Sequence, residues 1–463
     1  MNQSTTMGGT FDHILLSRIQ FALTAMFHVL WPVFTIGASL FLVVLEALWV
    51  KTAKEIYYRH ARFWSNLFVL NVAVAIATGI PMEFQFGTNW SPFSRTGGDF
   101  LGNMLGFEAA MAFMLDAAFI SIMIFGWKRV SARMHLFATS MVALGASVSA
   151  FWIMAANSWM HTPAGGYFKE GKFIITSNFD AIFNPDMYWS VSHMWAACME
   201  ISVFCIGGIS AWYILKKRHT EFFLVSFKMA VIAAIVITPL QIFLGDGAGR
   251  SDLEYQPAKL AAMELHWRTN APGEGAPFSI AAWPDTERER NRWSIEIPYA
   301  LSVLATHTLT GKVKGLREIA PEDRPPLVVN YYAFRIMVAS GVALFLLMLW
   351  TLRAWWKNTL TGELAPGQKS LLYSWIVAIP LSYLAMESGW VLREVGRQPW
   401  VVYGLLRTSD SASTVPAGTV AFSLAGFTLL YATFLTLFLA FARNLIRKGP
   451  DLETPVQIPG LKK

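Results

Sequence analysis

Apolar residues in this chain gather in long blocks that polar segments separate. A membrane-spanning helix needs roughly 20 consecutive, mostly apolar residues, and blocks of that length recur from end to end of the sequence. The blocks that meet this requirement lie at about 20–50, 63–84, 100–126, 135–160, 187–214, 222–245, 330–352, 371–391 and 417–442. The pattern therefore predicts an all-α, polytopic membrane helix bundle with about nine transmembrane helices.

The composition agrees with a membrane protein and excludes a set of soluble domains. Of the 463 residues, 54% are hydrophobic and only 14% are charged, whereas a soluble domain carries about 25% charged residues. The net charge of +7 comes from basic residues scattered between the apolar blocks, so a nucleic-acid partner is not expected. Cys198 and Cys205 would lie about 10 Å apart along one helix, which is too far for a disulfide.

Basic residues cluster after the first, third, fifth, seventh and ninth blocks. Lys51 and Arg62 follow the first block, and Arg443 and Lys448 follow the ninth. The alternate loops are poorer in basic residues, and the segment 85–99 holds only Arg95. Cytoplasmic loops of membrane proteins are enriched in Lys and Arg. The N-terminus is therefore predicted outside and the C-terminus in the cytoplasm.

One polar loop is much longer than the others and divides the chain into three parts. Residues 1–245 hold spans one to six, residues 246–329 form an external loop, and residues 330–463 hold spans seven to nine with a cytoplasmic tail. A loop of this length is commonly functional or disordered. The outer segment 392–416 also holds three arginines against the charge rule, and we expect these to pair with an anionic cofactor group.

Several ionisable side chains and one methionine lie inside the apolar blocks at a similar predicted depth. These residues are His28, Glu108, His193, Met337, Glu387 and Glu394. Each has an ordinary explanation when taken alone, because a buried His often bonds a neighbouring helix and a Met usually only packs. Ionisable groups in a membrane are nevertheless expensive and usually functional, and His and Met are common axial ligands of haem. The shared depth therefore predicts a haem layer in the outer half of the membrane.

A second polar layer is predicted further inward. Asp116 follows Glu108 by eight residues, which places it about 12 Å deeper along the same helix. Ser149 on the fourth span is expected at the depth of Asp116, and Asn157 returns to the outer half. These groups predict either a proton relay from the cytoplasm or interhelical hydrogen bonds, and the relay interpretation is strongest for the carboxyl of Asp116.

Several motifs along the chain resemble those of one known family. They are LSRIQFALTAMFH at 16–28, EFQFGTNWS at 83–91, GISAWY at 208–213, KLAAMELHW at 259–267, YYAFRIMVASG at 331–341 and GRQPW at 396–400. In this order they resemble subunit I of cytochrome bd-type quinol oxidases over nearly the whole chain. The short external loop resembles the branch that includes cyanide-insensitive enzymes.

The resemblance implies three haems and a ligand for each. His193 and Met337 match the axial pair of a low-spin haem b, His28 matches the ligand of one high-spin haem, and Glu394 matches the ligand of the other. Glu108 matches a carboxylate that lines the di-haem oxygen site. The implied cofactors are a low-spin haem b, a high-spin haem b, and either haem d or a third haem b in its place.

Further roles follow from the same resemblance. Lys259 and Glu264 match the quinol-binding pair on the external loop, which is called the Q-loop. Trp390 is expected between the haems and Arg397 beside them. Ser149 matches a proton-path residue, and Asp116 stands where the family often has Glu.

The implied protein is a quinol:oxygen oxidoreductase in a bacterial cytoplasmic (inner) membrane. It oxidises quinol at the outer face and reduces oxygen to water with cytoplasmic protons, so that it is electrogenic without being a proton pump. The expected partners are a homologous second large membrane subunit and, in some complexes, a small single-span subunit. The alternatives are a membrane cytochrome b that passes electrons between quinone and a partner, a secondary transporter, and a subunit that has lost its cofactors.

Overall fold

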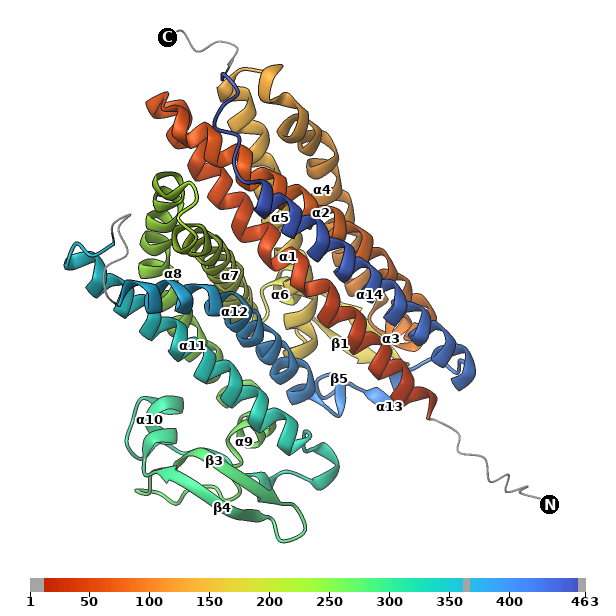
Figure 1. Ribbon diagram of the computed structural model, residues 1–463. Helices are drawn as coiled ribbons and strands as arrows, with labels where there is room; N and C mark the ends of the chain where they lie inside the picture. The colour runs from red at the N-terminus through yellow and green to blue at the C-terminus, as the bar shows by residue number, and fades with distance from the viewer. Residues whose placement is uncertain (1–11, 361–366, 457–463) are drawn as a thin grey trace.

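Long helices occupy all of the predicted blocks in the computed structural model, which describes residues 12–360 and 367–456 apart from the side chains at 112, 113, 116 and 117 (Figure 1). These helices are α1 (His13–Thr52), α2 (Glu55–Thr88), α4 (Gly98–Phe125), α5 (Ala132–His161), α7 (Met187–Leu215), α8 (Thr220–Tyr255), α11 (Leu327–Trp356), α12 (Gln368–Arg397) and α14 (Ala417–Lys448). Among the described residues, eight of them are long and apolar enough to cross a membrane, and the end of α4 belongs to the shorter apolar segment Ala118–Lys128. The all-α membrane fold is thus confirmed, while the count of nine spans and the orientation stay predictions.

Several helices extend beyond their apolar blocks, and three of them show why. α1 begins seven residues before the predicted span, because the Asp12 side chain accepts a hydrogen bond from the Ile14 amide and caps the helix. α8 continues ten residues past position 245, where Asp246 and Arg250 pair one turn apart at 3.2 Å. α12 runs to Arg397, so the predicted loop 392–416 begins as helix. The apolar pattern marks what can lie in lipid, whereas the helix continues wherever capping and side-chain pairs support it.

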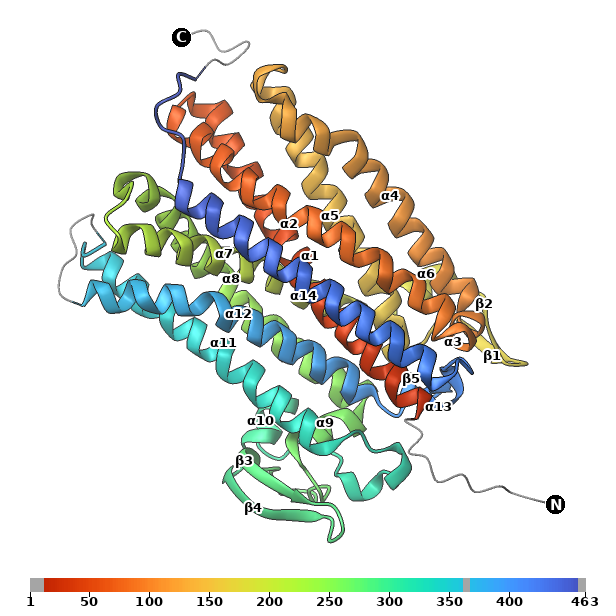
Figure 2. The same ribbon diagram turned by 45° about the vertical axis from the view of Figure 1, so that its right-hand side comes forward.

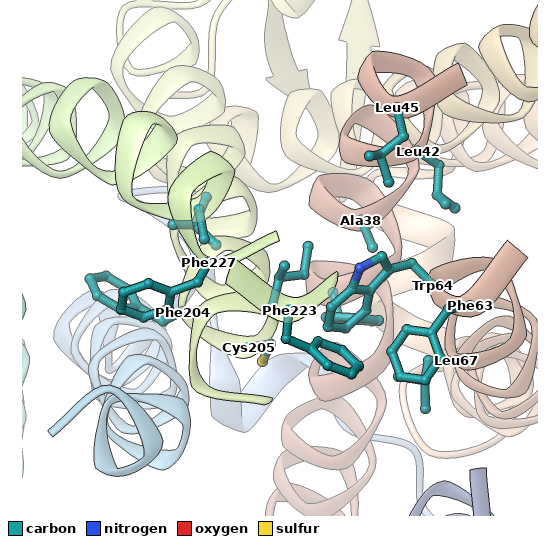
Figure 3. Packing of buried hydrophobic residues seen from close by; sticks show 14 of the residues in the cluster. Ala38, Leu42, Leu45, Phe63, Trp64, Leu67, Phe204, Cys205, Phe223 and Phe227 are labelled. Carbon is teal, nitrogen blue, oxygen red and sulfur yellow. The ribbon is translucent and has the colours of Figure 1, made fainter. Parts of the chain in front are cut away.

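The main apolar core lies where α1, α2, α7 and α8 meet (Figure 3). Leu42, Phe68, Phe204 and Phe223 are fully buried there. α1 and α7 approach closely at Gly37, since this residue has no side chain. A Cβ atom there would collide with the Cys198 carbonyl oxygen. Both cysteines are buried and free, as the sequence predicted.

The long loop folds into a compact unit at one end of the bundle (Figures 1 and 2). It contains α9 (Pro257–Glu264), an antiparallel hairpin of β3 (Phe278–Asp285) and β4 (Arg290–Ile297), α10 (Ala300–Thr306), η2 (Leu316–Glu318) and η3 (Pro321–Asp323). α1 begins at the same end, which we call the loop end, and α14 ends at the opposite end. Because α8 reaches Tyr255, this unit starts about ten residues later than the predicted boundary at 246.

Shorter elements close the connections between the long helices. They are α3 (Ser91–Thr96), η1 (Gly126–Lys128), the hairpin of β1 (Gly166–Lys169) and β2 (Lys172–Ile175), α6 (Asn178–Ile182), the hairpin of β5 (Trp400–Val402) and β6 (Leu406–Arg407), and α13 (Thr408–Ser411).

Candidate functional site

A cluster of charged side chains joins α5, α7 and α12 at the loop end. Glu394 Oε1 accepts a hydrogen bond from Asn157 Nδ2 at 2.7 Å, and its Oε2 accepts one from Arg397. Arg393 donates to Asn157 Oδ1 at 2.5 Å and to Asp186 Oδ2 at 2.7 Å. Asn157, for which the sequence left both a proton relay and an interhelical hydrogen bond open, thus bridges Glu394 and Arg393 across two helices. Arg393 pairs with a carboxylate of the protein, whereas Arg397 also has buried nitrogens without a partner among the described residues, available for the anionic group that the sequence predicted.

Arg397 is buried without enough partners. Its side chain is 5% exposed, yet Nε and Nη1 have no hydrogen-bond partner among the described residues. A buried cation whose donors are unpaired is strongly destabilising, whereas an anionic group beside it would satisfy both nitrogens. The Glu394 side chain in the same cluster is 37% exposed and therefore borders open space. The pair fits the edge of an anionic prosthetic group such as a haem with its propionates.

His193 on α7 is the second sequence-predicted ligand with an unused ring nitrogen. Its Nδ1 has no partner among the described residues, and its Nε2 lies 3.5 Å from Gln241 Nε2, which is at the limit of a hydrogen bond. The ring packs against Gly245 of α8, where a Cβ atom would lie 3.2 Å from Cε1. A buried imidazole with so little hydrogen bonding fits the donor chemistry of a metal ligand.

Met337 lies on α11, and its sulfur faces α12. A Cβ atom at Gly389 would lie 3.1 Å from Met337 Sδ, so the glycine makes room for the thioether. Both α7, which carries His193, and α11 pack against α8 and α12. The two predicted axial ligands therefore approach the same pair of helices, although the contacts described here do not join them directly.

His28 on α1 lies against α2. Its Nδ1 is 2.9 Å from the Thr78 hydroxyl, which itself donates to the Val74 carbonyl at 2.9 Å. A hydroxyl has a single proton, and Thr78 donates it to the Val74 carbonyl. The hydroxyl oxygen therefore accepts from His28, and the imidazole proton is on Nδ1. Nε2 then keeps its lone pair, as in a metal-binding His whose other ring nitrogen donates a hydrogen bond to a neighbouring group. Gly79 lies beside the ring, where a Cβ atom would be 3.3 Å from Cε1.

Glu108 and Ser149 meet between α4 and α5. The Ser149 hydroxyl donates to Glu108 Oε1 at 2.6 Å. Ser149 therefore lies level with Glu108, and the expectation that it shares the depth of Asp116 is wrong, because the antiparallel pairing of α4 and α5 sets its height. Asp116 is in α4, but its side chain lies outside the described residues. Trp390 on α12 is half-buried against the main apolar core.

Lys259 and Glu264 lie on α9, and both are buried and paired. Lys259 Nζ donates to Asp252 Oδ1 at 3.0 Å, and Glu264 Oε2 accepts from Arg335 Nη2 at 2.7 Å. Arg335 also donates to the Ser279 carbonyl and stands two residues before Met337. Burial raises the pKa of Glu264 to about 7, against the opposing effect of the Arg335 guanidinium. A carboxyl with this pKa can accept and release a proton near neutral pH.

Sequence reasoning missed the partners of this pair. Arg335 had a visible signal, since it is a charged residue inside the block 330–352. Asp252 had none, because its pairing depends on the angle between α8 and α9.

The chain matches known proteins over nearly all of its length. Residues 16–450 match the family model described as cytochrome bd terminal oxidase subunit I. The chain is 35% identical to "Cytochrome bd ubiquinol oxidase subunit 1" of Bacillus subtilis (strain 168), with 97% of this chain and 96% of that protein covered. It is 34% identical to "Cytochrome bd-II ubiquinol oxidase subunit 1" of Escherichia coli (strain K12), with 97% and 100% covered.

A solved structure shares the fold. The bd oxidase from Geobacillus thermodenitrificans superposes with a TM-score of 0.87 at 30% sequence identity, and the match covers 96% of this chain and 100% of that chain. The arrangement of long helices and loop described above is therefore the same in both.

Proposed function

Since this chain belongs to the cytochrome bd terminal oxidase subunit I family, we propose that its loop-end residues hold the haems and the quinol of such an oxidase. As a member, it is the haem-bearing subunit of a terminal quinol oxidase, a quinol:oxygen oxidoreductase of respiratory electron transport. It is a multi-pass membrane protein, and the "subunit 1" names of its relatives imply a partner subunit. The transporter and the non-oxidase cytochrome b are not favoured.

The observation that carries the residue assignments is the unpaired guanidinium of Arg397 next to Glu394. His193 and Met337 would hold a low-spin haem b, His28 one high-spin haem, and Glu394 the other. The last two sites would take a high-spin haem b and either haem d or a third haem b. When bound, the haems supply electron transfer and the reduction of oxygen.

The chain's own residues handle the protons for oxygen reduction. Glu108 would hold a proton at the carboxylate that Ser149 bonds, and Asp116 would supply it from deeper in α4. Trp390 would lie between the haems. Arg397 would neutralise propionate charge with its two unused nitrogens.

The quinol site would use the two ends of α9. Glu264 would accept a quinol proton, since its pKa of about 7 allows both protonation states, and Arg335 orients the carboxylate. Lys259, held by Asp252, would bind a quinol oxygen. With the loop end outside, quinol protons leave on the outer side and protons for water come from the cytoplasm. Each separated charge then stores about 2.3 kcal/mol per 100 mV without pumping.

The proposed assembly includes a homologous second large membrane subunit and, in some complexes, a small single-span subunit. It lies in a bacterial cytoplasmic membrane.

Haem analysis of the purified complex tests the proposal. We expect three haems per chain by pyridine haemochrome and mass analysis, and a reduced-minus-oxidised spectrum in which part of the haem reacts with CO. A complex without haem would overturn the assignments.

A further inference from the structure

His161, the last residue of α5, is buried between the loop unit and the Glu394 cluster. We propose that His161 is a positioning residue that couples the quinol site on α9 to Glu394, so that ligand occupancy at one site changes affinity at the other. The inference rests on the proposed function, because it takes Glu394 as a haem ligand and α9 as the quinol helix. Neither the sequence motifs nor the roles assigned above include His161.

Hydrogen bonding fixes the proton on the His161 ring. Gln256 Nε2 lies 2.9 Å from His161 Nδ1 and 2.9 Å from the His161 carbonyl oxygen. Because a carbonyl only accepts, the group that serves both atoms is the amide NH₂, and Nδ1 is therefore an acceptor. The ring proton of the neutral imidazole is thus on Nε2.

This Nε2–H faces Glu394. The distance from His161 Nε2 to Glu394 Oε1 is 3.8 Å, and Nε2 has no hydrogen-bond partner among the described residues although the side chain is only 2% exposed. The distance is too long for a hydrogen bond, so a shift of several tenths of an ångström in either side chain makes the bond. Glu394 Oε1 already accepts from Asn157, and a second donor would pull the carboxylate toward α5.

The other side of His161 is tied to the quinol helix. Gln256 follows the last residue of α8 and is the N-cap residue of α9, which carries Lys259 and Glu264. α9 also contacts α12 directly, since a Cβ atom at Gly396 would lie 2.8 Å from Lys259 Cγ. The quinol helix is therefore linked to the surroundings of Glu394 in two ways, through Gln256 and His161, and through the contact of Lys259 with Gly396, two residues after Glu394. A displacement of α9 has to move at least one of these contacts.

The experiment measures the coupling in the purified holo-complex, with CO as the oxygen-site ligand and a quinone-analogue inhibitor as the quinol-site ligand. Allosteric coupling typically changes affinity 5–150-fold and is reciprocal. We expect CO to change the inhibitor affinity of the wild-type complex at least about 5-fold. His161→Phe replaces the imidazole by an aromatic ring without nitrogens, and it should reduce the CO-induced change in inhibitor affinity to less than about twofold. His161→Gln, which keeps an N–H donor, should restore part of it.

Two further variants keep the test decisive. Gln256→Leu removes the hydrogen bond to His161 from the loop side. This variant replaces His161→Phe in the test if that complex does not retain its haems. His60→Phe is the matched control, because His60 is also fully buried and bonded through Nδ1, to Ser226, but lies on α2 near the opposite end. Control complexes should keep the wild-type coupling.

The results separate the two levels of inference. Undiminished coupling in a haem-replete His161→Phe or Gln256→Leu complex overturns the role of His161, and so does a haem-replete wild type without coupling. A wild-type complex without haem overturns the proposed function instead.

Discussion

Two buried acid–base clusters lie at opposite ends of the bundle, and their hydrogen bonding differs. At the end away from the loop, Glu46 and His135 are 0% and 1% exposed, with His135 Nδ1 2.8 Å from Glu46 Oε2. Thr139 donates to Glu46 Oε1 at 2.9 Å, and His135 Nε2 lies 3.1 Å from the Met123 carbonyl. Every polar atom of this pair has a partner.

The loop-end cluster is unsatisfied by comparison. Among the described residues, Arg397 has two nitrogens without partners, and both carboxylate oxygens of Glu387, ten residues earlier on α12, also have none. An unsatisfied buried polar group costs about 1–3 kcal/mol, and more if it is charged. The comparison teaches that burial alone does not mark a functional site. What distinguishes the loop-end cluster is that the unpartnered nitrogens belong to Arg397, which bonds the proposed haem ligand Glu394, so that a bound anionic group would complete their hydrogen bonds.

The largest effect is expected from removing a ligand at the loop end. His193→Ala should abolish the low-spin haem signal and reduce quinol oxidation by at least about 100-fold. Mutation of a residue that only hydrogen-bonds to a metal ligand already lowers metal affinity or activity about 10–100-fold. The reduced-minus-oxidised spectrum of the purified complex measures this loss. An unchanged spectrum would contradict the assignment of His193 as a ligand.

A relay residue should affect turnover without affecting haem content. Asp116→Asn keeps the size of the side chain but cannot carry a proton, so oxygen reduction should slow by about 100-fold, the low end of what acid–base groups contribute. Oxygen consumption is compared with haem content in the same preparation. Normal turnover in this variant would rule out the relay.

The satisfied cluster should respond through stability alone. His135→Ala leaves Glu46 buried with Thr139 as its remaining hydrogen-bond partner, and the loss of the His135 bond should lower the free energy of unfolding by about 1–3 kcal/mol. Thermal unfolding of the complex and its haem spectrum are measured together, and the spectrum of the folded fraction should be that of the wild type. The double variant Glu46→Leu/His135→Leu removes both polar side chains and should recover much of the stability. A haem band that shifts in His135→Ala would break the distinction between the two ends.

The smallest effect is expected in the pH profile of quinol oxidation. Burial raises the pKa of Glu264 to about 7, so the carboxylate that accepts a proton becomes the main form only above that pH. The rate should therefore rise as pH increases through about 7, and Glu264→Gln should remove this limb from the profile. Steady-state quinol oxidation between pH 5.5 and 8.5, roughly one and a half units on either side of that pKa, is the measurement. A rate that falls over this range would show that the protonated form is the active one.

The sequence predicts the spans because lipid imposes one simple requirement, a long apolar stretch. It does not predict where a helix ends, since the last ten residues of α8 depend on local pairs such as Asp246 and Arg250. Ligand-type residues such as His28 and His193 stood out because polar groups are rare inside such stretches. Their partners were harder to find: the height of Ser149 and the pairing of Lys259 with Asp252 follow from how separate helices meet.

A glycine on the neighbouring helix lies beside three of the proposed iron ligands: Gly79 beside His28, Gly245 beside His193 and Gly389 beside Met337. A methyl group at any of these positions would lie 3.1–3.3 Å from the ligand side chain, closer than side chains normally pack. The position of each ligand side chain is thus limited by the distance between two backbones as well as by its own rotamer. An alanine at one of these positions would displace a single ligand side chain by a fraction of an ångström, giving three separate means of adjusting one proposed metal bond at a time while leaving the ligand's chemistry intact.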